Sequence, residues 1–210
     1  MFKDRTEAGQ ILAKALAQYK GKDAVVCALP RGGVGIGYEV AKFLQAPLDI
    51  VVTRKIAHPE NPEYAICAVD EKGFRICDSE AARFVDQEWL ERETLRQTEE
   101  ALRRIEVYRK GRKPEKLSGK TVILVDDGIA TGLSMRAAIK RVRRENPKEI
   151  IVATPVAPRD TIEELGKEVD QMIALENGRN YLGAVGSYYA SFPQVSDDEV
   201  IELLEEKTKL

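Results

Sequence analysis

Apolar and polar positions alternate along the chain in blocks that predict strands and helices in turn. Short continuous apolar runs are typical of strands buried on both faces, and they occur at 24–30, 48–55, 121–125, 149–157 and 171–176. Apolar residues at helical spacing predict helices between and after these runs, at 5–19, 34–45, 133–145, 159–168 and 197–207. Strands separated by single helices favour a parallel sheet with helices on both faces, so we expect an α/β fold.

The middle of the chain departs from this alternation. Residues 65–77 predict a hairpin, and a long polar helix is expected from Ser79 to Lys110. That helix carries only a narrow apolar strip, made of Leu95, Leu102 and Ile105. Such a strip suits packing on a neighbouring element or on a second subunit, so we expect this helix to form a flap and the protein to be a homodimer.

Composition narrows the class of protein. With 210 residues, of which 43% are hydrophobic and 32% charged, the chain is typical of a soluble globular domain. Its net charge of −2 gives no strong pull toward nucleic acid or an anionic membrane. No apolar run has the length of a membrane span, and the first residues are charged, unlike a signal peptide, so we expect a cytoplasmic location.

The cysteines support the same location. Cys67 and Cys77 face each other across the predicted hairpin, so they could form a disulfide. However, three cysteines without metal-ligand spacing suggest a reducing compartment. We therefore expect these thiols to be reduced.

Candidate chemistry collects where the predicted strands end. The first run is followed by Arg31-Gly32-Gly33, the second ends in Arg54-Lys55, and the third is followed by Asp126-Asp127 and a Gly-Ile-Ala-Thr-Gly turn. The carboxyl ends of parallel strands meet at one edge of a sheet, where such sheets bind ligands. A Gly-rich turn before a helix directs N–H groups at an anion, whereas two acids repel phosphate and suit hydroxyls or a metal. A ligand with phosphate beside hydroxyls is a sugar phosphate.

The segment 122–132, Val-Ile-Leu-Val-Asp-Asp-Gly-Ile-Ala-Thr-Gly, resembles the signature of the type I phosphoribosyltransferases, which bind 5-phosphoribosyl-1-pyrophosphate (PRPP) there. The resemblance implies that Asp126 and Asp127 hold the ribose hydroxyls. It also implies that the following turn binds the 5-phosphate, through Gly128, Ile129, Ala130, Thr131 and Gly132.

Two further motifs resemble the same family. Leu-Pro-Arg-Gly-Gly at 29–33 is similar to its pyrophosphate loop, and Thr-Arg-Lys at 53–55 to the opening of its mobile loop. The resemblance implies that pyrophosphate contacts Arg31, Gly32, Gly33 and Arg54, with Lys55 joining Asp126 and Asp127 in catalysis. It implies a Mg²⁺ cofactor held through PRPP and water rather than by direct protein ligands. We also expect a strained or cis non-proline peptide between Pro30 and Gly32.

Several features depart from the family pattern. Ala130 stands where hypoxanthine-guanine members have an Asp facing the purine N7, so this turn supplies no general base. Gly128 replaces the usual aliphatic residue, and the long helix is not part of the minimal fold. We expect one domain, 1–210, in which 56–118 is a mobile loop, hairpin and long-helix insert and 178–210 is a small C-terminal hood. The aromatic residues of that hood are candidates for stacking on a base, although core packing explains them equally well: Tyr188, Tyr189 and Phe192.

The implied function is Mg²⁺-dependent transfer of phosphoribosyl from PRPP to a nitrogen nucleophile, with a nucleobase as the expected acceptor. Two alternatives remain open. One is a PRPP-sensing regulator that binds nucleic acid through the basic tract 103–116, against which the net charge speaks. The other is a phosphoribosyl-handling enzyme of another class, such as a PRPP hydrolase. Each motif also has a simpler interpretation, as an ordinary β-to-α turn or a solvated strand end.

Overall fold

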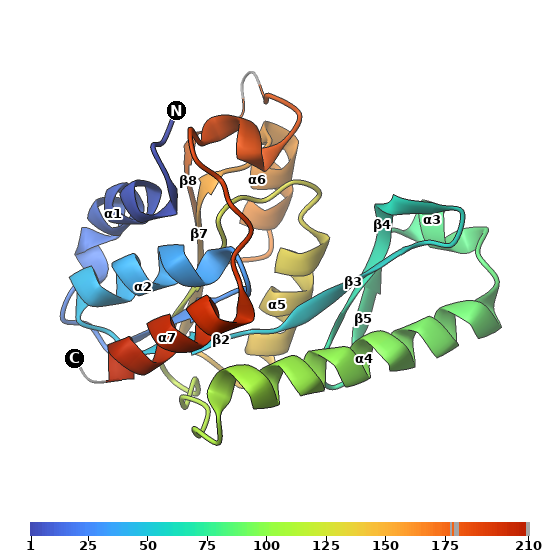
Figure 1. Ribbon diagram of the computed structural model, residues 1–210, viewed down its shortest axis with the longest axis horizontal. Helices are drawn as coiled ribbons and strands as arrows, with labels where there is room; N and C mark the ends of the chain where they lie inside the picture. Colours follow the sequence, from blue (N-terminus) through green and yellow to red (C-terminus); the bar gives the residue numbers. More distant parts are fainter. Residues whose placement is uncertain (177, 179–180, 209–210) are drawn as a thin grey trace.

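The computed structural model describes residues 1–176, 178 and 181–208. In this part of the chain the central sheet has five parallel strands in the order β2-β1-β6-β7-β8 (Figure 1). They are β1 (Ala24–Ala28), β2 (Leu48–Ile50), β6 (Thr121–Val125), β7 (Glu149–Val156) and β8 (Gln171–Glu176). The expected parallel α/β sheet is confirmed.

Helices cover both faces of this sheet (Figure 1). One face carries α1 (Arg5–Ala15), α2 (Gly33–Leu44) and α7 (Asp197–Thr208), and the other carries α5 (Leu133–Arg143) and α6 (Arg159–Gly166). Strand β6 is buried throughout, and its side chains alternate between two cores. Ile123 and Val125 join the core under α1 and α2, whereas Val122 and Leu124 join the core under α5. The continuous apolar run therefore reports burial on two faces.

A second, antiparallel sheet of order β3-β4-β5 projects from the central one as an arm (Figure 1). Its elements are β3 (Thr53–His58), β4 (Asn61–Asp70) and β5 (Arg75–Cys77), followed by α3 (Ser79–Arg83) and α4 (Gln87–Arg109). The hairpin expected at 65–77 is confirmed. The single strand expected at 48–55 is wrong, because the chain leaves the central sheet after Ile50 and begins a strand of the arm at Thr53. Residues 56–64, the part of the insert that precedes the expected hairpin, lie in β3, the following turn and the start of β4.

The long helix expected from Ser79 to Lys110 is broken into α3 and α4. The side chain of Asp78 accepts hydrogen bonds from the N–H groups at the start of α3, and Asp86 accepts one from Trp89 N (2.7 Å) at the start of α4. An aspartate that satisfies free N–H groups in this way begins a new helix. The polar sequence from Ser79 to Lys110, from which one long helix was predicted, did not show this break.

The antiparallel sheet of the arm lies between α4 and α5. On one face of its sheet, Cys67 and Val69 pack with Leu90 of α4, and on the other Ala68 packs with Leu133 of α5. Cys67 and Cys77 occupy opposite positions of β4 and β5 and are joined by a disulfide. The expectation of reduced thiols is wrong for this pair, because the hairpin register places the two side chains on the same face.

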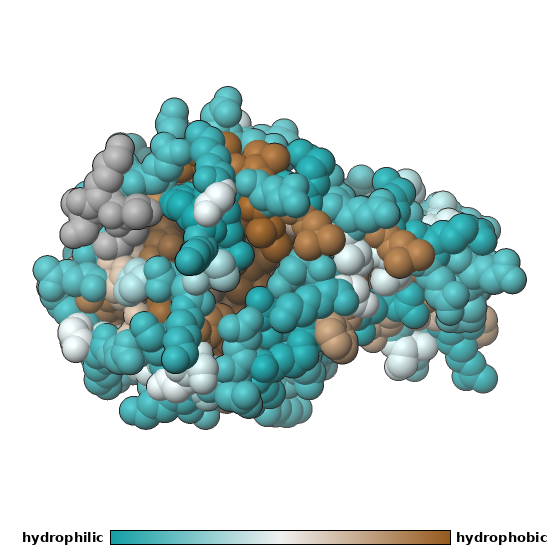
Figure 2. Space-filling view, turned by 90° about the horizontal axis from the view of Figure 1, so that it is seen from below, coloured by the Kyte–Doolittle hydropathy of each residue, from teal (hydrophilic) through white to brown (hydrophobic). Residues whose placement is uncertain are grey.

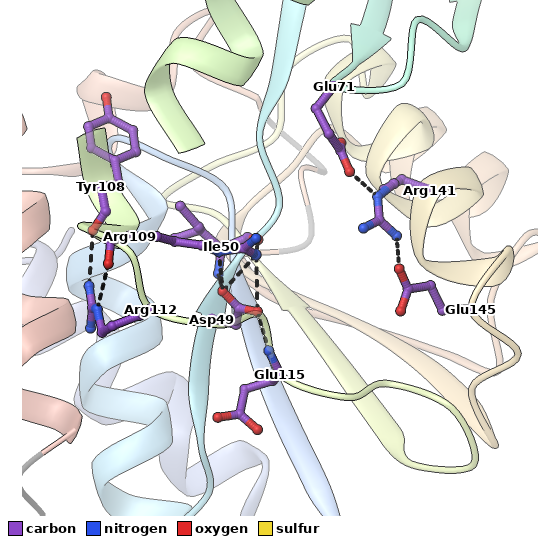
Figure 3. A network of polar contacts seen from close by, with 9 residues as sticks. All are labelled: Asp49, Ile50, Glu71, Tyr108, Arg109, Arg112, Glu115, Arg141 and Glu145. Carbon is purple, nitrogen blue, oxygen red and sulfur yellow. Dashed lines mark hydrogen bonds and ion pairs between the residues drawn. The ribbon is translucent and has the colours of Figure 1, made fainter. Parts of the chain in front are cut away.

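Polar networks anchor the arm to the central sheet (Figure 3). At the end of α4, Arg109 donates from Nη2 to both carboxylate oxygens of Asp49 on β2, at 2.9 and 3.1 Å. On the other side, Arg141 of α5 pairs with Glu71 in the β4–β5 turn and with Glu145 (2.6 Å to Glu145). Polar contacts thus hold the arm to the rest of the molecule at two places, through β2 and through α5.

The C-terminal segment divides into two parts. Residues 185–188 form a short 3₁₀ turn, and the backbone there is joined to the N-terminus by Phe2 N to Tyr188 O (2.7 Å) and Ala190 N to Phe2 O (2.8 Å). The chain then returns so that α7 packs on α2 and α4. The expected hood at 178–210 is therefore not one structural unit in the described residues. None of the described helices is long and apolar enough to cross a membrane.

Candidate active site

The ends of β1 and β6 meet at the carboxyl edge of the central sheet, and two glycines allow them to approach closely. A Cβ on Gly32 would lie 1.9 Å from Oδ2 of Asp127, and one on Gly33 would lie 2.9 Å from the Cα of Asp126. Any side chain at either position would displace the acids. The structure thus brings the Arg31 loop and the acid pair together, and the close approach requires glycine.

The peptide between Pro30 and Arg31 is cis, as expected for this loop. The guanidinium of Arg31 lies 3.5 Å from Oδ1 of Asp197 at the start of α7, and the same Oδ1 accepts a hydrogen bond from the hydroxyl of Tyr108 (2.7 Å). The structure therefore ties the side chain of Arg31 to an acid as it stands. A pyrophosphate contact by that side chain remains a prediction.

Asp126 is a partly buried acid that lines the cavities described below. Its Oδ1 accepts a hydrogen bond from the backbone N–H of Asp127 at 2.8 Å. Burial, and then the neighbouring charge of Asp127, raise the pKa of the Asp126 carboxyl well above its usual value, while Lys55 acts in the opposite direction. A positive group arriving in this site would favour the ionised form.

Asp127 is paired with a cation that the sequence did not single out. Nε of Arg5, at the start of α1, lies 2.8 Å from Oδ2 of Asp127, and the two side chains are each only 14% exposed. Burial raises the pKa of Asp127, and the guanidinium of Arg5 opposes that rise. Arg5 also donates to the carbonyl of Pro193 (2.7 Å) and lies 3.8 Å from the centre of the Phe192 ring. No local pattern marks Arg5, since it is one arginine in an amphipathic helix, 122 positions before Asp127.

The turn after the acids lines a small cavity of about 50 Å³ at the start of α5. The residues lining it include Lys55, Asp126, Gly128, Ile129, Ala130, Thr131, Gly132 and Ser134. Gly132 has φ 78° and begins α5 without a side-chain cap, which leaves the helix N-terminus open to an anion. The N–H of Ile129 is already bonded to the carbonyl of Val156 (2.8 Å), so an anion would have to use the later amides.

The structure explains why position 128 is a glycine. A Cβ at this position would lie 2.2 Å from Cγ1 of Val185. The C-terminal segment therefore occupies the space that an aliphatic residue would need at the turn.

A larger cleft of about 250 Å³ adjoins the small cavity and shares Lys55, Asp126 and Ser134 with it. Its lining comes from β3, α4 and α5 and from the turns that follow β1 and β6: Leu29, Pro30, Thr53, Arg54, Lys55, Arg104, Asp126 and Ser134. The structure thus brings Arg54 and Lys55 to Asp126, as the sequence predicted, whereas Asp127 does not line this cleft. Arg104 and Ser134 were missed. Ser134 follows the Gly-rich turn closely and could have been included from its position, whereas Arg104 lies in what the sequence presented as a solvated helix.

The aromatic residues near position 190 lie on the side of Asp127. Tyr188 and Tyr189 are both buried, and the hydroxyl of Tyr189 donates to the backbone carbonyl of Asp127 at 2.6 Å. Phe192 contacts the ring of Tyr189 (centroids 4.8 Å apart) and the guanidinium of Arg5. This placement favours core packing over base stacking for the two tyrosines, and it leaves Phe192 as the more open ring.

These features define a class of protein: a parallel α/β sheet with an acid pair, an open helix N-terminus and a cationic cleft at one edge is the arrangement of a type I phosphoribosyltransferase fold. Comparison with known proteins agrees. The phosphoribosyl transferase domain family matches residues 4–190, so the chain belongs to this family.

Individual relatives extend the match to nearly the whole chain. Two curated proteins of Mycobacterium tuberculosis, from strains CDC 1551 and H37Rv, carry provisional names as phosphoribosyl transferases. Each is 40% identical over 207 residues, which is 98% of this chain and 46% of theirs. The chain thus spans about half the length of these relatives. The crystal structure of TT1426 from Thermus thermophilus is 43% identical, covers 98% of both chains and has a TM-score of 0.82.

Proposed function

We propose that this chain binds PRPP at the edge of the central sheet and transfers its phosphoribosyl group to a nitrogen nucleophile, with a nucleobase as the acceptor and pyrophosphate as the second product. The observation that carries the proposal is the junction of the two cavities. An open helix N-terminus, a partly buried acid and two cations from the start of β3 meet there, at Gly132, Asp126, Arg54 and Lys55.

Each part of PRPP has a matching group. The 5-phosphate suits the small cavity at the start of α5, where Thr131 and Ser134 add hydroxyl groups. The ribose hydroxyls suit Asp126 and Asp127. The pyrophosphate suits the larger cleft, whose lining includes Arg54 and Lys55.

The reaction follows from this placement. When the nitrogen nucleophile displaces pyrophosphate from C1, positive charge develops on the ribose ring while negative charge leaves with the pyrophosphate. Fixed negative groups at Asp126 and Asp127 stabilise the first, and the cations of the cleft stabilise the second. Because Asp126 is partly buried, its charge is screened less by water than that of an exposed acid, which increases its effect on the developing charge.

The residues present fit a Mg²⁺ ion only in company with the substrate. Among the described residues no group of three or more His, Cys, Asp or Glu side chains could hold a metal. Asp126 and Asp127 provide the carboxylate oxygens that Mg²⁺ prefers, and this ion commonly takes its other ligands from substrate phosphates and water. When bound, it would neutralise charge on the pyrophosphate.

The basic tract gives little support to the alternative of a nucleic-acid-binding regulator, because several of its cations are paired within the protein. Within 103–116, Arg103 and Arg104 pair with Glu100, Arg109 pairs with Asp49, and Lys110 pairs with Glu205. Cations that are paired within the protein release fewer counterions on contact with a phosphate backbone. No feature of the described residues favours this alternative over transfer.

A homodimer and a cytoplasmic location remain predictions from the sequence. The side chains of Leu95 and Leu102 on α4 are 66% and 45% exposed, whereas Ile105 is partly buried against the core. Figure 2 views the molecule from the side of α4 and shows small separate hydrophobic areas on a largely hydrophilic arm. If a second subunit binds at α4, Leu95 and Leu102 are the apolar side chains that it would cover.

The proposal is tested by a screen of nucleobases and amines with PRPP and Mg²⁺, in which pyrophosphate release is measured against a reaction without acceptor. We expect release that depends on one acceptor class. Release at the same rate without any acceptor would indicate PRPP hydrolysis instead, and PRPP binding without release would indicate a sensor.

A further inference from the structure

Two adjacent arginines on α4 share one carboxylate but face different surroundings. Nε of Arg103 lies 2.7 Å from Oε2 of Glu100, and Nε of Arg104 lies 2.8 Å from Oε1 of the same residue. These contacts, with Arg103 first, lower the pKa of Glu100 to about 2. The side chain of Arg103 is 54% exposed and lines an outer groove, whereas that of Arg104 is 20% exposed and lines the cleft that contains Asp126; Arg54 lines both. One carboxylate for two guanidinium groups leaves a net positive charge there.

The cleft already contains a cation without an acidic partner. Arg54 is half-buried, and its Nε donates to a neutral acceptor, Oε1 of Gln97 (3.0 Å). The ion pairs among the described residues include none made by Arg54. Burial and the charge of Arg104 both lower the pKa of Arg54. Both guanidinium groups line the cleft, so an anion bound between them would relieve the repulsion that Arg54 experiences.

The position of Arg104 is fixed by the turn of α4 that follows it. Tyr108 is fully buried and donates to Asp197 at 2.7 Å. Arg109 is held by Asp49 through both carboxylate oxygens (Figure 3). These anchors fix the helix backbone at Arg104, and the contact of its Nε with Glu100 (2.8 Å) orients the side chain, which is what a binding group needs.

We propose that Arg104 is a third cation of the pyrophosphate-binding cleft, beside Arg54 and Lys55, and that the arm supplies it to the site. The inference rests on the proposed function, and the ligand it names is the diphosphate group of the substrate or product. A bidentate guanidinium suits such a group, since two parallel N–H groups can meet two phosphate oxygens. The arm then completes the active site rather than only covering it.

The test is calorimetric titration, in excess Mg²⁺, of three ligands: PRPP, inorganic pyrophosphate and ribose 5-phosphate. Arg104→Gln should bind PRPP and pyrophosphate about 10- to 100-fold more weakly than the wild type, as expected for one hydrogen-bonded charge pair. It should bind ribose 5-phosphate as the wild type does. Arg103→Gln is the comparison variant, because it removes the neighbouring arginine and leaves Glu100 to Arg104 alone. Its affinities for PRPP and pyrophosphate should fall clearly less than those of Arg104→Gln, and its affinity for ribose 5-phosphate should be unchanged.

Arg104→Lys keeps the charge without the fork and should fall between the wild type and Arg104→Gln. It also carries the test if Arg104→Gln does not fold. Pyrophosphate bound equally by the wild type and both Arg104 variants would overturn the inference and leave the proposed function intact. Equal losses in Arg103→Gln and Arg104→Gln would also overturn it, because they would show a long-range charge effect. A wild-type protein that binds none of the three ligands would overturn the proposed function and this inference with it.

Discussion

Replacement of Arg5 by glutamine should destabilise the protein through Asp127. Arg5 and Asp127 form an ion pair at 2.8 Å with both side chains 14% exposed, and Asp127 lies next to the partly buried Asp126. Arg5→Gln keeps much of the side-chain volume but leaves a carboxylate with no opposing charge. Removing one partner of a buried pair costs about 3–5 kcal/mol, because the remaining charge stays buried.

The lower end of that range is appropriate, since the pair is not fully buried and glutamine can still donate one hydrogen bond. We expect a loss of about 3 kcal/mol, which corresponds to a fall of about 6–12 °C in melting temperature for a chain of this length. Most of the loss belongs to the carboxylate left behind. The contact of the guanidinium with the Phe192 ring adds about 0.5–1 kcal/mol at most.

The loss should increase with pH. Burial already raises the pKa of Asp127 in the folded protein, and removal of Arg5 raises it further. An acid whose folded pKa lies above its unfolded value of about 3.9 costs no stability below that value, and the cost grows as the pH rises toward the folded pKa. Arg5→Gln should therefore be further below the wild type at pH 8 than at pH 5.

The assay is thermal unfolding followed by circular dichroism at both pH values. Arg159→Gln is the matched control, because Arg159 pairs with Glu163 at the same 2.8 Å but the two side chains are 66% and 57% exposed. That change should cost less than about 0.5 kcal/mol. In the double variant Arg5→Gln, Asp127→Asn, removal of the charge should restore most of the loss. A single variant that melts with the wild type at pH 8, or a double variant that melts no higher than the single one, would refute this reasoning.

Three further changes test other parts of the structure. Gly128→Val should lower the melting temperature because Val185 fills the space, and Val185→Ala in the same chain should recover part of the loss; no recovery would mean that the two residues do not compete. Thr131→Ala should weaken PRPP binding about 2- to 10-fold by calorimetry, as for one neutral hydrogen bond, and an unchanged affinity would remove Thr131 from the phosphate site. Glutamates in place of Leu95 and Leu102 should convert a dimer to a monomer in sedimentation, and a wild-type monomer at micromolar concentration would remove the dimer.

The sequence predicted the central sheet well, because strands buried on both faces leave long apolar runs. The prediction from the sequence failed where the same residues can form two different structures and tertiary contacts decide between them. Nothing in the run from 48 to 55 shows that the chain changes sheets between Ile50 and Thr53. The break at Asp86 was also hidden, because aspartate is a cap or an ordinary helix surface residue according to its surroundings.

The candidate site divides in the same way. Asp126 and Gly32 were found because they follow strands, and parallel strands end at one edge. Lys55 was found although its predicted strand was wrong, because the arm begins next to the end of β2. Arg5 and Arg104 were missed because each comes from a distant helix that reaches the site only after the chain has folded. In isolation each is one charged residue on an amphipathic helix, and no spacing links it to the acids.

The central claim is that the acid pair holds the ribose while positive charge develops at C1. The direct measurement compares the wild type with Asp126→Asn and Asp127→Asn, using the acceptor that the screen identifies, with turnover measured beside PRPP affinity by calorimetry. A charge interaction made mainly in the transition state is worth on the order of 3 kcal/mol, so each change should slow turnover by roughly 100-fold. PRPP affinity should fall much less, because the phosphate and pyrophosphate contacts remain. Turnover that stays intact in both variants would contradict the claim, since the acids would then not lie at the reacting sugar.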